Sequence, residues 1–516
     1  MRAWQRSATE ALAEHDHASF LASATPAAGK TTFGLRVAHD MLRSGRVARV
    51  AVVGPTAHIC RQWAADAARY GIDLEPNRPN ADGPEPRDRQ GVAVTYQAIA
   101  AGPKVHARAA RRPTLVIADE PHHMGEHAAW GARMLEAFGT AEFRLLLSGT
   151  PFRSDNAAIP WVSYDQNGIS RADYVYGYPQ ALVDNVCRPI TFLPYDGEME
   201  WMGDGKLRRA TFDVVLPRAE TARRLRTALA ADGDWMAHVL RDADARLSEV
   251  RASGHPDAGG LVIAIDKEHA GAIAARLERV AGERPEIVTS DEPDASARIA
   301  AFSAGTRRWL VSVLMVSEGV DIPRLRVGVY ATTARTELFF RQVVGRFIRR
   351  TLAPEHQMSY LFMPADGVLK RLAAQVEEER NHALDLTPSV VDEDAVERER
   401  RAGDADAFAA LSSSAIADDA ILTETMQLFA TDPAPPPALA RFTAPEPIEA
   451  GFASRERMRD ERAGLVSRLS RITGEEHRVI HGRINRATGA ASVGAATRDQ
   501  LERGNELLSR ELARRR

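Results

Sequence analysis

The sequence has little of several features that define whole classes of protein. It contains two cysteines, Cys60 and Cys187, in 516 residues, which argues against a disulfide framework or a cysteine-built zinc site and predicts a reducing, cytoplasmic compartment. No run approaches the roughly 18 apolar residues of a membrane-spanning helix, and the first residues, MRAWQRSATEALAEHDH, lack the apolar segment of a secretory signal. We therefore expect a soluble protein with no membrane partner.

The chain also lacks an excess of charge of either sign. Its formal net charge is −3, with 27% charged and 44% hydrophobic residues, as in ordinary globular proteins. This balance excludes a chain that is a polyelectrolyte throughout, so any contact with nucleic acid must come from basic residues placed locally. At 516 residues the chain is too long for one hydrophobic core, and we expect two or three domains.

A turn of small residues followed by a helix stands near the N-terminus. The turn is ATPAAGKTT, residues 24–32, and the helix is predicted over Thr32–Leu42. Backbone N–H groups at such a helix start bind phosphate oxygens, while Lys30 would neutralise the β- and γ-phosphates and Thr31 would ligate Mg²⁺. The residues expected to contact the nucleotide are Ala28, Gly29, Lys30, Thr31 and Thr32. Ala24 replaces the first glycine of the usual pattern, so a chance loop is the alternative.

Strands and helices alternate after this loop, as a parallel sheet requires. The predicted strands are Arg49–Val53, Gly91–Val94, Thr114–Ala118 and Phe143–Leu147. Ligands bind at the carboxyl ends of the strands in open α/β sheets, so the residues that follow each strand are the candidates for a site.

Two adjacent carboxylates, Asp119 and Glu120, follow one of these strands. Asp119 would hold Mg²⁺, usually through water, and Glu120 would orient or deprotonate an attacking water. The hydroxyl groups of Ser148 and Thr150, after the next strand, could hydrogen-bond this acidic cluster. A solvated turn is the alternative for an acidic pair, and the phosphate loop upstream argues against it.

A basic amphipathic segment, FFRQVVGRFIRR, covers residues 339–350. On a helix it places Gln342, Arg346 and Arg349 one turn apart on one face. The residues of the apolar face are Phe340, Val343, Val344 and Phe347. An anion is expected opposite the polar face, and a solvated basic face is the alternative.

Taken together, these segments resemble the superfamily-2 helicases and translocases of the DExH kind, especially the motor subunits of type III restriction enzymes and related DNA repair translocases. The resemblance covers most of the first 365 residues and rests on the number, order and spacing of the motifs. In chain order they are AWQ (glutamine motif), ATPAAGKTT (I), VVGPTAHICRQW (Ia), VTYQAIA (Ib), DEPHH (II), SGTPFR (III), LVIAIDKEHA (IV), LVSVLMVSEGVDIPRL (V) and FFRQVVGRFIRR (VI).

The resemblance implies an α/β fold of two tandem RecA-like lobes, with ATP and Mg²⁺ bound between them. The residues it implies in the first lobe are Lys30, Thr31, Asp119 and Glu120. Gln342, Arg346 and Arg349 would reach across from the second lobe, where the arginines would stabilise charge on the transferring phosphoryl group. Gly319 and Asp321 of motif V would sense nucleotide and nucleic acid together.

Two departures from the family pattern bear on this resemblance. The glutamine motif is reduced to AWQ, so adenine recognition by Gln5 competes with the simpler interpretation of a polar residue on an N-terminal helix. Ala27 stands where relatives often have glycine, which predicts a slightly stiffer phosphate loop. ATP hydrolysis is expected to survive the change at Ala27.

The composition divides the chain into four parts. Lobe 1 is expected over 1–186, lobe 2 over 187–386, an acidic and proline-rich flexible linker over 387–453, and an arginine-rich helical module over 454–516. Within lobe 2, Leu216–Ala252 is predicted to be helical. The leucines and isoleucine expected inside the helical module are Leu465, Leu469, Ile472, Leu501, Leu508 and Leu512. The arginines that could contact phosphates are Arg457, Arg459, Arg468, Arg478, Arg483 and Arg486, with a solvated face or a protein-docking role equally open.

The sequence therefore favours an ATP-dependent nucleic-acid motor that couples hydrolysis between two lobes to movement on DNA. A backbone-directed grip would make it largely independent of base sequence. An RNA helicase is one alternative. A scaffold that binds nucleic acid, is switched by ATP without unwinding, and recruits partners through the C-terminal module is another.

Overall fold

The computed structural model describes residues 1–82, 88–126, 128–149, 159–164, 166, 170–203, 206–289, 295–313, 322–351, 357–385 and 451–515. The chain divides into two compact units, Met1–Ala24 with Gly29–Tyr176 and Ala440–Arg516, and Thr25–Ala28 with Gly177–Leu439. Thr150, Gly319, Asp321 and residues 387–450 of the predicted linker lie outside the described residues.

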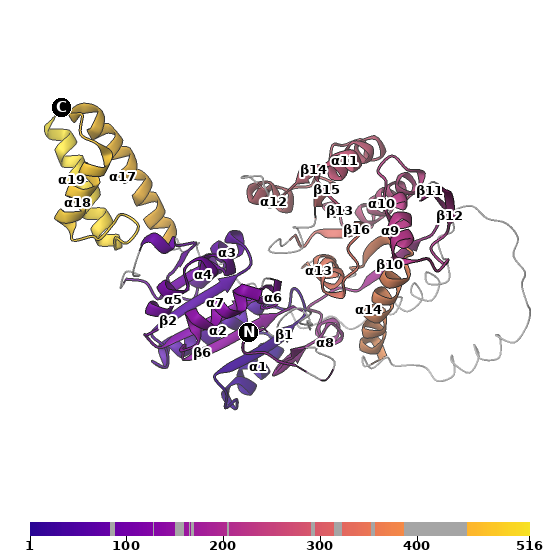
Figure 1. Cartoon of the computed structure of the whole chain (residues 1–516), viewed down its shortest axis with the longest axis horizontal. Helices are drawn as coiled ribbons and strands as arrows, with labels where there is room; N and C mark the ends of the chain where they lie inside the picture. Colours follow the sequence, from indigo (N-terminus) through magenta and orange to yellow (C-terminus); the bar gives the residue numbers. More distant parts are fainter. Residues whose placement is uncertain are drawn as a thin grey trace, which may run out of the picture. The chain divides into compact units, whose positions relative to one another are not determined.

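The first unit is built on a parallel sheet with helices packed around it (Figure 1). The strand order is β3-β4-β2-β5-β6-β1-β9. Its strands are β1 (Ser19–Ala24), β2 (Arg49–Gly54), β3 (Leu74–Pro76), β4 (Gly91–Thr95), β5 (Thr114–Asp119), β6 (Phe143–Ser148) and β9 (Tyr174–Tyr176). A small antiparallel pair, β7 (Ser163–Tyr164) and β8 (Ser170–Arg171), adjoins it in sequence. Every residue of β2 and β6 is buried, as continuous apolar strands require in a sheet that is covered on both faces.

Helices connect these strands in the order that the sequence predicts. They are α1 (Ala3–Ala13), α2 (Lys30–Arg43), α3 (Ala57–Ala68), α4 (Tyr96–Ala101), α5 (Pro103–Ala109), α6 (His123–Glu126) and α7 (Ala128–Phe138), with the 3₁₀ turn η1 (Asn80–Asp82). Threonines fix two of the helix starts, because the hydroxyl of Thr56 accepts from the N–H of Ile59 and that of Thr95 accepts from the N–H of Ala98. The helices α3 and α4 therefore begin directly at the strand ends.

The second unit has its own parallel sheet, with the strand order β10-β17-β16-β13-β15-β14. These strands are β10 (Ile190–Tyr195), β13 (Gly259–Ala264), β14 (Glu286–Val288), β15 (Trp309–Val313), β16 (Leu325–Ala331) and β17 (Ser359–Pro364). Its helices are α8 (Tyr178–Val183), α9 (Arg218–Ala228), α10 (Asp234–Ala252), α11 (Lys267–Ala281), α12 (Ala295–Ala304), α13 (Glu337–Phe347) and α14 (Gly367–Asp385). An antiparallel hairpin, β11 (Met199–Gly203) with β12 (Lys206–Ala210), follows β10. The two parallel sheets confirm the predicted tandem RecA-like architecture.

The prediction that Leu216–Ala252 is helical is confirmed for most of its length, where the chain forms two helices, α9 and α10. Gly233 is extended and serves as the N-cap of α10. Arg276 stabilises the break, since its Nη1 donates to the carbonyls of Ala231 at 2.6 Å and Gly233 at 2.9 Å. The carbonyl of Gly233 also accepts from the N–H of Ala237 at 3.1 Å, in the first turn of α10, so Arg276 binds the turn between the two helices without replacing a helical hydrogen bond there.

The C-terminal residues form the predicted helical module, α17 (Gly451–Thr473), α18 (His477–Thr488) and α19 (Arg498–Arg514), which belongs to the first unit. Its core consists of Leu465, Val466, Leu469, Ile480, Ile484 and Leu508. Ile472 lies on α17 at the predicted helical spacing, but it is outside this core, because its side chain is 54% exposed. None of the described helices is long and apolar enough to cross a membrane.

Candidate active site

Three neighbouring strands of the first sheet bring the predicted site residues to one edge. The strands β5, β6 and β1 lie side by side and run parallel. Their ends are level, because Ser23 pairs with Ser148 and Asp119 pairs with Leu147. The phosphate loop after β1, the acidic pair at β5 and Gly149 after β6 therefore meet, as the strand order in a parallel sheet requires.

The phosphate loop enters α2 through left-handed backbone. Gly29 has φ +93° and is the N-cap of α2, with no side chain to bond the first N–H groups of the helix. Ala27 has φ +68°, a conformation that a residue with a Cβ adopts at a cost. The helix start therefore offers its N–H groups and its positive dipole end to an anion.

Lys30 and Glu120 form an ion pair across 90 residues of sequence. The second oxygen of Glu120, Oε2, accepts from the backbone N–H of Gly149 at 3.1 Å and lies 3.5 Å from the hydroxyl oxygen of Ser148. Glu120 also has φ +52°, which is uncommon for a side chain of its size. The strained backbone and the three neighbours hold the carboxylate beside the phosphate loop.

The pKa of Glu120 lies below its ordinary value. Burial alone would raise this pKa, but electrostatic interactions with Lys30 and His122 and hydrogen bonds from Lys30 and Gly149 outweigh it. The ring Nδ1 of His122 lies 3.7 Å from Oε2 of Glu120. Glu120 is therefore an anion at neutral pH, which is the form that can accept a proton or a hydrogen bond from water.

Asp119 is held by two aromatic residues that the sequence analysis did not assign to the site. The indole Nε1 of Trp63, on α3, donates to Oδ2 of Asp119 at 2.8 Å. The hydroxyl of Tyr96, on α4, donates to the carbonyl oxygen of Asp119 at 2.9 Å. Trp63 is in the quoted motif Ia segment and Tyr96 in motif Ib, but their spacing gives no sign of a partner on a different strand.

Gln5 lies against the phosphate loop. Its Nε2 donates to the carbonyl of Gly29 at 3.0 Å, and its Oε1 accepts from the N–H of Arg2 at 2.8 Å. The neighbouring Trp4 stacks on Tyr176, with ring centroids 5.1 Å apart, which docks α1 onto the sheet. The structure therefore brings Gln5 to the loop residues, while its contact with adenine stays a prediction.

The second unit presents Gln342 and Arg346 on α13, but Arg349 is not on that helix. The helix ends at Phe347, and Arg349 forms an isolated antiparallel bridge with Cys187. The physical reason is that other groups bind the last carbonyls: Nε of Arg188 donates to Phe347 O at 2.7 Å, and the N–H of Arg188 donates to Ile348 O at 2.8 Å. The prediction of one helical face with all three residues is therefore wrong for Arg349.

The apolar face of α13 is as predicted. Its four residues are at most 4% exposed, namely Phe340, Val343, Val344 and Phe347. Arg346 is also buried, at 8% exposure. The predicted partners in motif V, Gly319 and Asp321, lie outside the described residues.

Comparisons with known proteins agree with these motifs. The family model of the type III restriction enzyme res subunit matches residues 1–153. A structure of a fragment assigned to the HsdR subunit of a type I restriction enzyme from Vibrio vulnificus YJ016 shares the fold, with a TM-score of 0.50 and 17% identity over 72% of this chain and 65% of that one. Residues 1–153 therefore match the family of restriction-enzyme res subunits, and the likeness to the HsdR fragment shows a shared fold.

Relatives of this helicase-like protein occur in mycobacteria. The uncharacterized protein MT2985 of Mycobacterium tuberculosis (strain CDC 1551 / Oshkosh) is 39% identical over 97% of this chain and 91% of its own length. The uncharacterized protein Rv2917 of Mycobacterium tuberculosis (strain ATCC 25618 / H37Rv) is 47% identical over 74% of this chain and 64% of its own length. The similarity to MT2985 therefore extends beyond the residues that the family model matches.

The helicase-like family uses ATP, and the residues of this chain fit the Mg²⁺ that accompanies it. The described residues contain no group of three or more His, Cys, Asp or Glu side chains that could hold a metal by themselves. Mg²⁺ is commonly bound by one or two protein oxygens together with the substrate's phosphates. The carboxylate of Asp119 and the hydroxyl of the half-buried Thr31 are such hard oxygen ligands.

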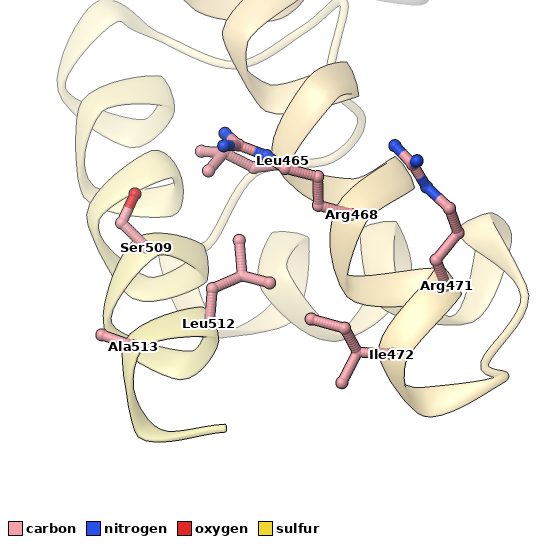
Figure 2. Close-up of a pocket in the computed structure, with 7 residues that line it drawn as sticks. All are labelled: Leu465, Arg468, Arg471, Ile472, Ser509, Leu512 and Ala513. Atoms are coloured by element: carbon pink, nitrogen blue, oxygen red, sulfur yellow. The ribbon is translucent and has the colours of Figure 1, made fainter. Parts of the chain in front are cut away.

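The helical module carries a pocket of about 460 Å³ between α17 and α19. Its lining residues, drawn in Figure 2, are Leu465, Arg468, Arg471, Ile472, Ser509, Leu512 and Ala513. Two of the arginines predicted to contact phosphates are instead in ion pairs: Arg459 with Glu75 at 2.9 Å, and Arg483 with Glu511 at 2.8 Å. Arg468 and Arg471 are exposed beside the pocket and have no carboxylate partner among the described residues.

Proposed function

We propose that this protein is a nucleic-acid-stimulated ATPase that moves along DNA. The observation that carries the proposal is the group formed by Lys30, Glu120 and Gly149 beside the start of α2. A lysine at a helix start and an ionised carboxylate next to it are what phosphoryl transfer to water needs: one group binds the phosphates and the other positions the nucleophile.

In the proposed reaction the residues of the first unit bind the phosphates, the metal ion and the attacking water. The N–H groups of Gly29, Lys30 and Thr31 cradle phosphate oxygens, and the Lys30 ammonium contacts the β- and γ-phosphates. Asp119 and Thr31 would hold Mg²⁺, which would supply positive charge to offset that of the phosphates. Glu120 accepts a proton or a hydrogen bond from the attacking water. Because Glu120 pairs with Lys30 here, the phosphates and Glu120 compete for one ammonium.

The second unit supplies the remaining charges in this proposal. Arg346 and Arg349 stabilise the charge that develops on the transferring phosphoryl group, a role worth about 10³ to 10⁵ in rate for arginine fingers generally. Gln342 assists in orienting the γ-phosphate, and Gly319 and Asp321 respond to nucleotide and nucleic acid. Adenine recognition by Gln5 is the last part of the proposed site.

The proposed division of the chain is 1–186 and 187–386 for the two lobes, 387–453 for a linker and 454–516 for the helical module. We propose that the module adds phosphate contacts through Arg468 and Arg471, since both are exposed beside one pocket. The scarcity of cysteine supports a cytoplasmic location.

DNA is the proposed track because the res-subunit family model and the SGTPFR segment both support a restriction-type motor. The test is ATP hydrolysis by the purified protein with single-stranded DNA, duplex DNA, forked DNA and RNA of matched length. We expect stimulation by at least one DNA. Stimulation by RNA alone would support an RNA helicase instead, and no stimulation by any of them would contradict a motor.

A second candidate is an ATP-switched scaffold that recruits a protein partner. The pocket between α17 and α19 favours it, because apolar side chains there lie beside two arginines (Figure 2). A scaffold would hydrolyse ATP without moving on DNA. A translocation assay that measures displacement of a bound protein or a third strand separates the two candidates.

A further inference from the structure

Trp63 connects two parts of the candidate site that are far apart in sequence. Its side chain is 1% exposed, and its Nε1 donates to Oδ2 of Asp119 at 2.8 Å. The other end of the indole packs against α2, where a Cβ added to Gly34 would lie 2.9 Å from the ring. The ring is therefore fixed between the helix that follows the phosphate loop and the acidic end of β5.

We infer that Trp63 is a positioning residue that sets the orientation of the Asp119 carboxylate toward the metal. The inference rests on the proposed function, in which Asp119 holds Mg²⁺. A hydrogen bond to Oδ2 fixes the rotation of the carboxylate about its Cβ–Cγ bond, and this rotation determines where Oδ1 points. The tyrosine hydroxyl of Tyr96 fixes the backbone of the same residue, so both ends of Asp119 are held.

The chemistry of the donor also suits this task. An indole N–H is neutral and donates one hydrogen bond. An arginine or lysine at the same place would bring a positive charge, which would compete with a metal ion for the carboxylate. A buried tryptophan orients the carboxylate and leaves its negative charge to attract Mg²⁺. Groups that orient metal ligands commonly affect metal affinity by about 10- to 100-fold.

Indole N–H groups elsewhere in the described residues have several kinds of partner. Trp235 donates to the backbone carbonyl of Asp196 at 3.1 Å, while Trp201 and Trp309 donate to the carboxylates of Glu220 and Asp244, at 2.6 and 2.7 Å. The distinction of Trp63 is therefore the place of its partner, at the candidate site. Trp63 donates to the side chain that is expected to bind the metal. The helix α3 that carries Trp63 has Thr56 as its N-cap and follows β2 closely. The ring is therefore attached to the same parallel sheet that carries Asp119.

The test separates the hydrogen bond from the volume of the ring. Trp63→Phe removes the N–H but also part of the ring, so a second variant replaces Trp63 with β-(3-benzothienyl)alanine, which keeps the bicyclic shape and has sulfur in place of the N–H. Trp235→Phe is the matched control. Binding of a fluorescent ADP analogue is titrated in excess Mg²⁺ and again in EDTA.

We expect wild-type protein and Trp235→Phe to bind the nucleotide more tightly with Mg²⁺ than without it. Both Trp63 variants should lose about 10-fold or more of the Mg²⁺-dependent gain, while their affinity in EDTA stays at the wild-type value. Undiminished Mg²⁺ dependence in the benzothienyl variant would overturn the inference. A wild-type protein that gains nothing from Mg²⁺ would instead contradict the proposed function, so the two failures are distinguishable.

Discussion

The guanidinium of Arg455 lies 2.9 Å from the carboxylate of Glu75, although 380 residues separate them. Arg455 also bonds both oxygens of Asp73, at 2.6 and 2.8 Å. On the same helix Glu456 pairs with Arg61 of α3 at 3.1 Å. These ion pairs attach the helical module to the sheet edge at β3, so the module is part of the first unit.

Replacing Arg455 should therefore destabilise the protein. Its side chain is 2% exposed and that of Glu75 is 7% exposed, so Arg455→Ala leaves a buried carboxylate with Arg89 and Arg459 as its remaining partners. We expect the free energy of unfolding to fall by about 3 kcal/mol, the lower end for a broken buried pair. Urea denaturation followed by fluorescence measures this. Arg503→Ala, at an exposed position on α19, is the control and should change stability by less than about 0.5 kcal/mol.

The same cluster predicts a pH dependence of stability. Burial alone would raise the pKa of Glu75, but the charges of Arg89, Arg455 and Arg459 lower it below the ordinary glutamate value. The unfolded chain then binds more protons than the folded one, so the stabilisation is complete above the ordinary value of about 4.3 and is lost as pH falls through the lower folded pKa. Urea midpoints across this acidic range should fall less steeply in Arg455→Ala than in wild type. Parallel curves for the two proteins would contradict this assignment.

Replacing the arginines of the second unit should impair ATP hydrolysis and leave nucleotide binding largely intact. Arg346→Ala and Arg349→Ala are expected to lower ATP turnover by up to about 10³- to 10⁵-fold, because their charges are needed when the phosphoryl group transfers. Nucleotide affinity should change by less than about 10-fold. Arg350→Ala is the matched control, since Arg350 neighbours Arg349 and bonds Asn185 at 2.6 Å. Normal turnover in both test variants would mean that these arginines have no role in hydrolysis.

The two arginines beside the pocket should contribute to DNA affinity in a salt-dependent way. Arg468→Glu with Arg471→Glu removes two exposed charges without touching the ion pairs of Arg455, so it is a cleaner test than deletion of residues 454–516. Each lost contact with single-stranded DNA should lower the log–log salt slope by about 0.7. Fluorescence anisotropy at several salt concentrations measures the slope, with Arg503→Glu as the control. An unchanged slope would assign the module to protein docking.

The sequence predicts those parts of the fold that depend on local pattern. Apolar runs such as Thr114–Ala118 appear as buried strands, and the small-residue turn before Lys30 appears as a helix start. The lysine and Glu120 were both candidates, and their pairing follows because parallel strands bring their carboxyl ends to one edge. Local pattern and sheet topology are therefore sufficient to predict the part of the candidate site that contains Lys30 and Glu120.

Contacts between distant side chains were not predictable in the same way. Arg188 binds the carbonyl at the end of α13, and Arg276 binds the turn before α10. The hydrogen bond from Trp63 and the attachment through Arg455 likewise join residues that no periodicity relates. Each contact is a hydrogen bond or an ion pair between polar groups, and only the folded chain shows which groups are partners.

The central claim is that Lys30 and Glu120 belong to an ATPase that nucleic acid stimulates. Its most direct test is steady-state ATP hydrolysis, with and without single-stranded DNA, by wild type, Lys30→Ala and Glu120→Gln. We expect DNA to stimulate the wild type, both variants to lose turnover by at least about 10²-fold, and Glu120→Gln to retain ATP binding. Turnover that persists in both variants would show that hydrolysis occurs elsewhere and would contradict the account.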